Sequence, residues 1–121
     1  MSPRSKPAIL VVEDEAFTRM ATADALEDRG FSPYEAGDAR EALALLTEHP
    51  EIILLFTDVD MPGGMDGVQL AHRARQVRPD VGIIITSGRR RVPVPAGGSF
   101  LPKPYRPQQL AEEIERKVAS G

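Results

Sequence analysis

The sequence predicts an α/β fold built on a mainly parallel sheet of five strands. Two wholly apolar runs, residues 8–12 and 52–56, leave no polar face and are typical of strands that helices cover on both sides. Segments with helical spacing alternate with the strand-like runs, which favours parallel strands joined by right-handed crossovers. Both runs are followed by acidic residues. Carboxylates are therefore expected at the carboxyl edge of the sheet, where ligands bind in this class of fold.

Length and composition limit the classes of protein to consider. The 121 residues suit one domain, expected over residues 8–121, after a flexible polar tail at residues 1–7. The net charge of −3 gives no electrostatic reason to expect a nucleic acid or an anionic membrane surface as a partner. The longest apolar runs have five residues, too few for a membrane span or a signal peptide. The absence of cysteine excludes thiol chemistry and agrees with a cytoplasmic protein.

The amino-terminal strand is followed by a helix of about four turns and a short strand at residues 31–34. Gly30 is typical of a residue that ends a helix. The apolar positions that recur at helical spacing, and are expected to face the sheet, are Ala16, Met20, Ala23 and Leu26.

Two further helices are predicted to begin with a capping box, formed by Asp38 with Glu41 and by Asp66 with Gln69. Pro50 ends the first of these helices, and a strand then leads to Asp58. The positions expected to face inward are Ala42, Leu45 and Leu46 in one helix and Leu70, Ala71, Ala74 and Val77 in the other.

The carboxyl-terminal third is predicted to hold strands at residues 81–86 and 99–102 and a last helix that begins at Pro107. The inward positions of that helix are Leu110, Ile114 and Val118.

The crossover at residues 89–98 departs from this pattern because it contains two prolines, two residues apart, followed by two glycines. We expect no regular helix there, so the domain has about four helices, with Val92 and Val94 lying over the sheet. That face is then one helix short, and apolar surface remains between the fourth and fifth strands for a protein partner or a second copy of the chain.

The predicted strands bring a set of polar residues to one edge of the sheet: Glu13, Asp14, Asp58, Thr86 and Lys103. Crowded carboxylates raise one another's pKa unless a cation compensates, and oxygen ligands suit Mg²⁺. Asp58 is then a nucleophile able to form an acyl phosphate, while Lys103 and Thr86 contact phosphoryl oxygens. Each residue alone is more often a helix cap or a surface side chain, but five together on one edge indicate a site.

The motifs VVEDE, FTDVDMPGGMDG, ITSG and FLPKP, in this order and on these strands, resemble the receiver domain of two-component response regulators. The resemblance covers essentially the whole chain. It implies a flavodoxin-like, doubly wound sheet of order 2-1-3-4-5, with the fourth helix of the family reduced or absent here. It also implies that Asp58 accepts a phosphoryl group from a histidine kinase or a histidine phosphotransfer protein.

The same resemblance assigns roles to the other site residues. Asp14, Asp58 and the backbone carbonyl of Asp60 bind Mg²⁺, with Mn²⁺ as a substitute, and Glu13 acts mainly through water. Thr86 and Lys103 bind phosphoryl oxygens, and the Lys103-Pro104 peptide bond is cis. Phe100 stands at the position of the switch aromatic, which works together with Thr86. A phenylalanine has no hydroxyl for a tyrosine-type hydrogen bond.

Three functions are compatible with these residues. The first is a stand-alone receiver that signals by protein contact, or as a phosphoryl shuttle or sink, and catalyses only its own phosphorylation and dephosphorylation. The second is a phosphatase of the haloacid-dehalogenase type, because Asp58-Val59-Asp60 resembles its DxD motif, although that motif wants Thr or Val where Pro62 stands. The third is a phosphorylation-independent interaction module, whose hallmark is the loss of an acid, Thr or Lys, and none is lost here.

Overall fold

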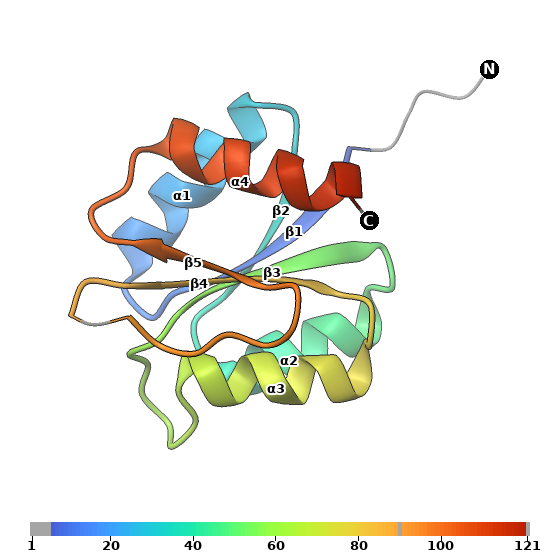
Figure 1. Cartoon of the computed structure of the whole chain (residues 1–121), viewed down its shortest axis with the longest axis vertical. Coiled ribbons are helices and arrows are strands. Elements are labelled where there is room, and N and C mark those ends of the chain that lie inside the picture. The colour runs from blue at the N-terminus through green and yellow to red at the C-terminus, as the bar shows by residue number, and fades with distance from the viewer. Residues whose placement is uncertain (1–5, 90, 121) are drawn as a thin grey trace.

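A computed structural model describes residues 6–89 and 91–120, and the chain folds into a sheet between two layers of helices (Figure 1). The elements in chain order are β1 (Ala8–Val12), α1 (Ala16–Asp28), β2 (Ser32–Ala36), α2 (Ala39–Glu48), β3 (Ile52–Asp58), α3 (Gly67–Val77), β4 (Gly82–Ser87), β5 (Ser99–Pro102) and α4 (Pro107–Ser120). Most of the tail predicted at residues 1–7 lies outside the described residues. No helix among the described residues is long and apolar enough to cross a membrane.

The sheet has the predicted order, β2-β1-β3-β4-β5, and every neighbouring pair is parallel. Helices α1 and α4 cover one face and α2 and α3 the other (Figure 1). Side chains of β1 alternate between the two layers: Leu10 packs in the cluster that includes residues of α2 and α3, while Ile9 and Val11 pack with residues of α1 and α4. The apolar runs are therefore strands buried on both faces, as predicted.

The helix starts largely follow the predicted capping chemistry. Asp66 and Gln69 form the full capping box of α3. Asp38 caps α2 by accepting a hydrogen bond from the Glu41 backbone N–H at 2.8 Å. The Glu41 side chain, however, accepts from the backbone N–H of Gly37 rather than from that of the cap residue, so the second half of the predicted box is wrong.

Several side chains predicted to face inward are exposed: Ala16, Met20, Val77, Val118 and Ile53. The first two lie in the early turns of α1, and the valines lie at or near the carboxyl ends of α3 and α4, so the apolar spacing does not predict burial in these terminal parts of the helices. Ile53 is 38% exposed for a different reason. The register of β1 against β3 shifts at this point, so that Ala8 pairs with Ile52 and Ile9 with Leu54, and Ile53 is skipped.

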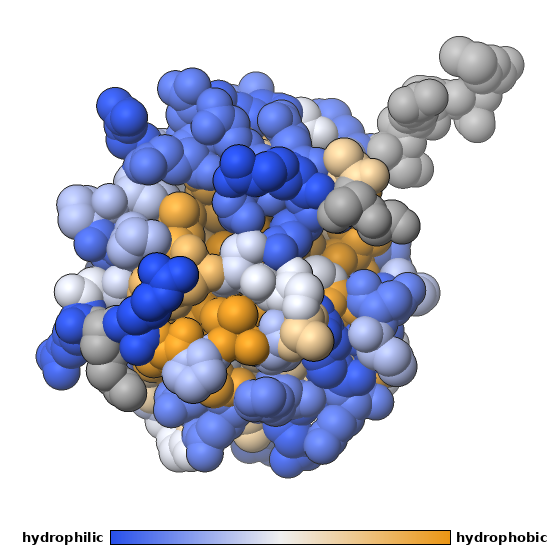
Figure 2. Space-filling model, viewed as in Figure 1, coloured by the Kyte–Doolittle hydropathy of each residue, from blue (hydrophilic) through white to orange (hydrophobic). Residues whose placement is uncertain are grey.

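The crossover from β4 to β5 contains no helix among its described residues, which confirms the prediction. Val92 is buried in the core cluster beside α2 and α3, and Val94 is half-buried against it. Two cationic side chains hold the far end of the crossover: Arg75 of α3 donates to the Ala96 carbonyl at 2.8 Å, and Lys117 of α4 donates to the Gly97 carbonyl at 2.5 Å. Figure 2 shows apolar residues over the crossover and β5, but Val94, Phe100 and Leu101 are half-buried, and no large apolar side chain among the described residues of these segments is exposed.

Candidate functional site

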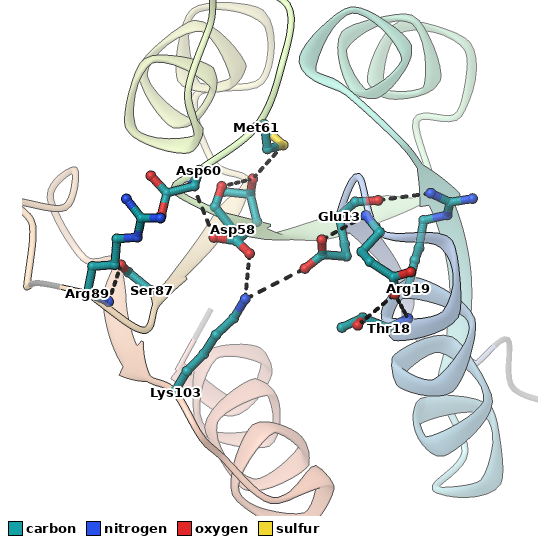
Figure 3. A network of polar contacts seen from close by, with 11 residues as sticks. Glu13, Thr18, Arg19, Asp58, Asp60, Met61, Ser87, Arg89 and Lys103 are labelled. Atoms are coloured by element: carbon teal, nitrogen blue, oxygen red, sulfur yellow. Dashed lines mark hydrogen bonds and ion pairs between the residues drawn. The ribbon is translucent and has the colours of Figure 1, made fainter.

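Three of the predicted site residues meet directly at the carboxyl edge of the sheet (Figure 3). Asp58 is the last residue of β3, Glu13 follows β1, and Lys103 follows β5. The Lys103 Nζ lies 2.5 Å from Asp58 Oδ2 and 3.7 Å from Glu13 Oε1. Both carboxylates belong to buried residues, which are 8% (Glu13) and 6% (Asp58) exposed. A single cation, that of Lys103, therefore faces two buried carboxylates.

Burial raises the pKa of the Glu13 carboxyl from 4.5 to about 7. The backbone N–H of Glu15 opposes this shift, and the neighbouring Asp14 and Asp58 carboxyl groups add to it. Desolvation by burial lowers the pKa of Lys103, but the hydrogen bond to Asp58 and the negative charges of Asp58 and Glu13 outweigh it, so the net shift is upward. The site is short of positive charge in the absence of a further cation.

Thr86 lies beside Asp58, because the two residues are register partners in β4 and β3. Its exposed fraction is 2%. Its hydroxyl has no hydrogen-bond partner among the described residues. A buried hydroxyl without a partner loses hydrogen bonds that it makes in water, so it favours a ligand oxygen placed near it. A backbone hydrogen bond also ties Thr86 to the chain that follows β3: the Thr86 carbonyl accepts from the Val59 backbone N–H at 3.0 Å.

The loop after Asp58 fixes the orientation of the carboxylate. The Asp60 backbone N–H donates to Asp58 Oδ1 at 3.1 Å, and the Asp60 side chain is exposed. The Thr57 hydroxyl donates to the Asp58 carbonyl at 2.9 Å. With Lys103 on the other carboxylate oxygen, each Asp58 oxygen has one donor, and the carboxylate is held in one orientation at the strand end.

Two residues that the sequence analysis did not single out also shape the site. Gly67, the first residue of α3, leaves so little room that an added Cβ would lie 2.0 Å from the Asp58 carbonyl oxygen. Arg19 of α1 donates to the Glu13 carbonyl at 2.9 Å and pairs with Glu35 of β2. The DG pair before α3 was a signal for Gly67, but nothing in the sequence pointed to Arg19, whose contacts are all made between separate elements.

The residues of the predicted metal site are oxygen donors only, which suits Mg²⁺. No group of three or more His, Cys, Asp or Glu side chains among the described residues is arranged to hold a metal ion. Two carboxylates and one backbone carbonyl nevertheless fit this ion, because Mg²⁺ commonly takes one or two carboxylates and keeps several waters.

The remaining predicted features lie next to this centre. The Lys103-Pro104 peptide bond is cis, as the resemblance implied. Phe100 of β5 is half-buried against the core, and the Arg91 guanidinium carbon lies 5.4 Å from the centre of its ring. The switch position is therefore in contact with the helix-free crossover, through a cation–π interaction.

Fold and site together define an α/β domain with two buried carboxylates, a buried hydroxyl and a lysine at the carboxyl edge of its sheet. A family model described as the response regulator receiver domain matches residues 9–115. The chain therefore belongs to the response regulator receiver domain family of two-component systems.

Two curated relatives come from Brucella abortus. The sensor kinase CckA is 38% identical over 117 residues, which are 91% of this chain but only 12% of that protein. The response regulator receiver protein CpdR is 34% identical over 119 residues, which are 93% of this chain and 98% of CpdR. Several other relatives are longer regulators, and the chain spans about half the length of ArcA from Escherichia coli.

Solved structures agree with this assignment. A CheY-like receiver domain protein from Methanospirillum hungatei is 28% identical with a TM-score of 0.88, and the match covers 96% of both chains. The receiver domain of the hybrid histidine kinase CckA is 38% identical with a TM-score of 0.81, covering 92% of this chain and 98% of that one. Nothing in these comparisons supports the haloacid-dehalogenase alternative, and the DVD segment ends the third strand here rather than the first strand of that family.

Proposed function

We propose that Asp58 accepts a phosphoryl group from a phosphohistidine and that the modified domain signals through protein contacts. The observation that carries this proposal is the buried Thr86 hydroxyl, which has no partner among the described residues and lies beside the carboxylate that Lys103 contacts at 2.5 Å. A phosphoryl group on Asp58 gives both the hydroxyl and the ammonium an oxygen to donate to.

In the transfer step, an Asp58 carboxylate oxygen forms a bond to phosphorus while the bond between phosphorus and the imidazole nitrogen of the donor breaks. The electron pair of the broken bond stays on the imidazole. Lys103 moves from the Asp58 oxygen to a phosphoryl oxygen, and Thr86 donates to another. Asp14, Asp58 and the Asp60 carbonyl would hold a Mg²⁺ ion, with Glu13 acting through water; the ion would supply positive charge to the phosphoryl oxygens, and Mn²⁺ could substitute.

The proposed phosphoryl donor is a histidine kinase or a histidine phosphotransfer protein. Helix α1 offers such a partner an apolar surface beside the site, because Phe17 is 82% and Met20 51% exposed. A hollow of about 670 Å³ between α1 and the segment after β5 adjoins this surface and includes Lys103 and Pro104 in its lining. A donor that packs there brings its phosphohistidine to the edge where Asp58 lies.

The proposed output is an unidentified cytoplasmic protein, contacted through the crossover and β5. Phosphorylation draws Thr86 toward the phosphoryl group and shifts the conformers of residues 91–98, rather than moving a rigid helix. The half-buried apolar side chains of Val94, Phe100 and Leu101, which no helix among the described residues of the crossover covers, support this proposal. A second copy of the chain is an alternative occupant of that surface, and a shuttle or sink for phosphoryl groups is an alternative role.

Intact-mass measurement after incubation with acetyl phosphate and Mg²⁺ tests the chemistry. We expect one added phosphoryl group on the unmodified protein and none on Asp58→Asn, which keeps the shape but removes the nucleophile. Asp60→Asn, two residues away and exposed, is the matched control and should still be labelled. Labelling of the Asp58→Asn variant would refute the assignment, and many turnovers on a small phosphomonoester would favour a phosphatase instead.

A further inference from the structure

A second hollow lies at the opposite edge of the sheet, away from Asp58. It has a volume of about 430 Å³ and is lined by the start of β3, the carboxyl-terminal turns of α3 and α4, and the turn before β4. In Figure 1 the carboxyl ends of these two helices lie on the same side of the molecule, opposite the loop that follows β3. The volume is within the usual range for a site that binds a small molecule.

The hollow has an apolar floor and an apolar rim. Leu54 and Val81 are both 1% exposed and form part of its lining, while Ile53 and Val118 are each 38% exposed. Ile53 is the residue that the register shift of β1 skips, and Val118 lies in the last turn of α4. Two large apolar side chains thus meet solvent in one concavity, where a ligand with an apolar body would cover them.

The same hollow is rich in positive charge. Arg75, Arg78 and Lys117 line it, against one acidic side chain, Asp80. Among the described residues, neither arginine takes part in an ion pair. Both are half-buried, so their charges are screened less by water than those of exposed residues.

The hydrogen bonds of the two arginines go to backbone carbonyls. Arg75 donates from Nε to the Val81 carbonyl at 2.7 Å and from Nη1 to the Ala96 carbonyl, while Arg78 donates to the carbonyls of Leu46, Pro50 and Ile52. These contacts give both side chains a structural role. A carbonyl dipole does not neutralise a guanidinium, however, and a guanidinium has five N–H donors, of which the bonds of Arg75 use two.

From this combination we infer that the hollow binds a small organic anion with an apolar body, such as an aromatic or branched carboxylate. The apolar body lies on Ile53 and Val118, and the carboxylate faces Arg75 and Arg78. Charge complementarity excludes an organic cation, and the apolar rim distinguishes the site from one for inorganic phosphate. Because the hollow lies at the other edge of the sheet from Asp58, this binding is independent of the proposed phosphorylation.

The probe for this site is 2-naphthoate, titrated into the ¹⁵N-labelled protein and followed by backbone amide shifts. A ligand of this size should bind with a dissociation constant on the order of 1 mM. We expect the largest shifts at residues 53–54, 75–82 and 117–118. The neutral analogue 2-naphthamide keeps the apolar body and should bind about tenfold or more weakly, because a charge-assisted contact is lost.

Two matched variants locate the site. Val118→Asp places a carboxylate on the rim and should weaken 2-naphthoate binding about fivefold or more. Val77→Asp makes the same change on another exposed valine near the end of a helix, outside the lining, and should leave binding within about twofold. Both variants should still accept a phosphoryl group from acetyl phosphate, which shows that they fold.

Three results would overturn the inference. Equal binding of 2-naphthamide would show that the cations contribute nothing, and shifts centred on α1 would place the ligand in the other hollow. A concentration-dependent dimer that Val118→Asp disperses would assign the surface to a second copy of the chain instead.

Discussion

Substitution of Gly67 by alanine should destabilise the domain more than any other glycine-to-alanine change at its sites of negative φ. The added Cβ would lie 2.0 Å from the carbonyl oxygen and 2.8 Å from the carbonyl carbon of Asp58, and 3.0 Å from the Val59 Cα. All three are backbone atoms, of Asp58 at the end of β3 and of Val59 directly after it, so no flexible side chain can move aside. Helix α3 and β3 must separate by about 1 Å to relieve the overlap.

The cost follows from the contacts at this point. Overpacking of a dense interior costs about 1–3 kcal/mol. The separation also lengthens the hydrogen bond from the Gly67 N–H to the Val59 carbonyl, now 2.8 Å, whose loss costs about 1 kcal/mol. The better helix propensity of alanine offsets part of this. With this offset of up to about 1 kcal/mol, we expect a net loss of about 1–3 kcal/mol in the free energy of unfolding, which for 121 residues lowers Tm by roughly 4–12 °C.

Gly88→Ala is the matched control, because its added Cβ would meet only Lys103 side-chain carbons at 3.6 and 3.8 Å, which is ordinary contact. Thermal unfolding followed by far-ultraviolet circular dichroism should place the Tm of this variant within about 2 °C of the parent. A Gly67→Ala protein that melts within about 3 °C of the parent would refute the reasoning, because α3 would then have moved away from β3 without a measurable loss in the free energy of unfolding.

Further predictions concern the site. Asp14→Asn should weaken Mg²⁺ binding roughly tenfold or more by calorimetry, and unchanged affinity would mean that Asp14 is not a ligand. Asp60→Asn or Asp60→Ala should remain phosphorylatable with altered hydrolysis kinetics, whereas complete inactivity would give the side chain an essential role. Because the folded-state pKa of Glu13 lies above its ordinary 4.5, stability in the presence of a chelator should fall as pH rises from about 4.5 through about 7. In urea titrations Glu13→Gln should lack this part of the fall, and identical slopes would contradict the shift. Backbone chemical shifts of residues 91–98 should change with a phosphoryl mimic; identical shifts would contradict the proposed switch.

Sequence reasoning identified the elements and the edge at which the polar residues gather. Strand ends are local events, so the positions of Asp58 and Thr86 at the ends of β3 and β4 followed from where the apolar runs stop. The helical spacing of apolar residues predicts one inward face for a whole helix, but it does not indicate which turns of that face are covered. Met20, Val77 and Val118 fit the spacing of the inward faces, yet each is at least 38% exposed.

The missed features depend on distances between separate segments. No residue near Ile53 in the sequence indicates that the pairing of β1 with β3 skips it. The close approach of Gly67 to the Asp58 carbonyl, and the reach of Arg75 to the Ala96 carbonyl, arise only once α3 is packed on the sheet. A single sequence carries no direct signal for such contacts, because they depend on the summed geometry of several elements.

During synthesis, the carboxylates of the site are made before the lysine that contacts them. Lys103 follows Asp58 by 45 residues, and a ribosome adding 5–20 residues per second needs roughly 2–9 seconds to cover that interval. During this time Glu13 and Asp58 have been made but their ammonium partner has not. A nascent chain that stops before β5 lacks Lys103, the residue proposed to contact a phosphoryl oxygen. Under the proposed function, the site is therefore complete only after the last strand has been made, and an unfinished chain should be a poor acceptor for the phosphoryl donor.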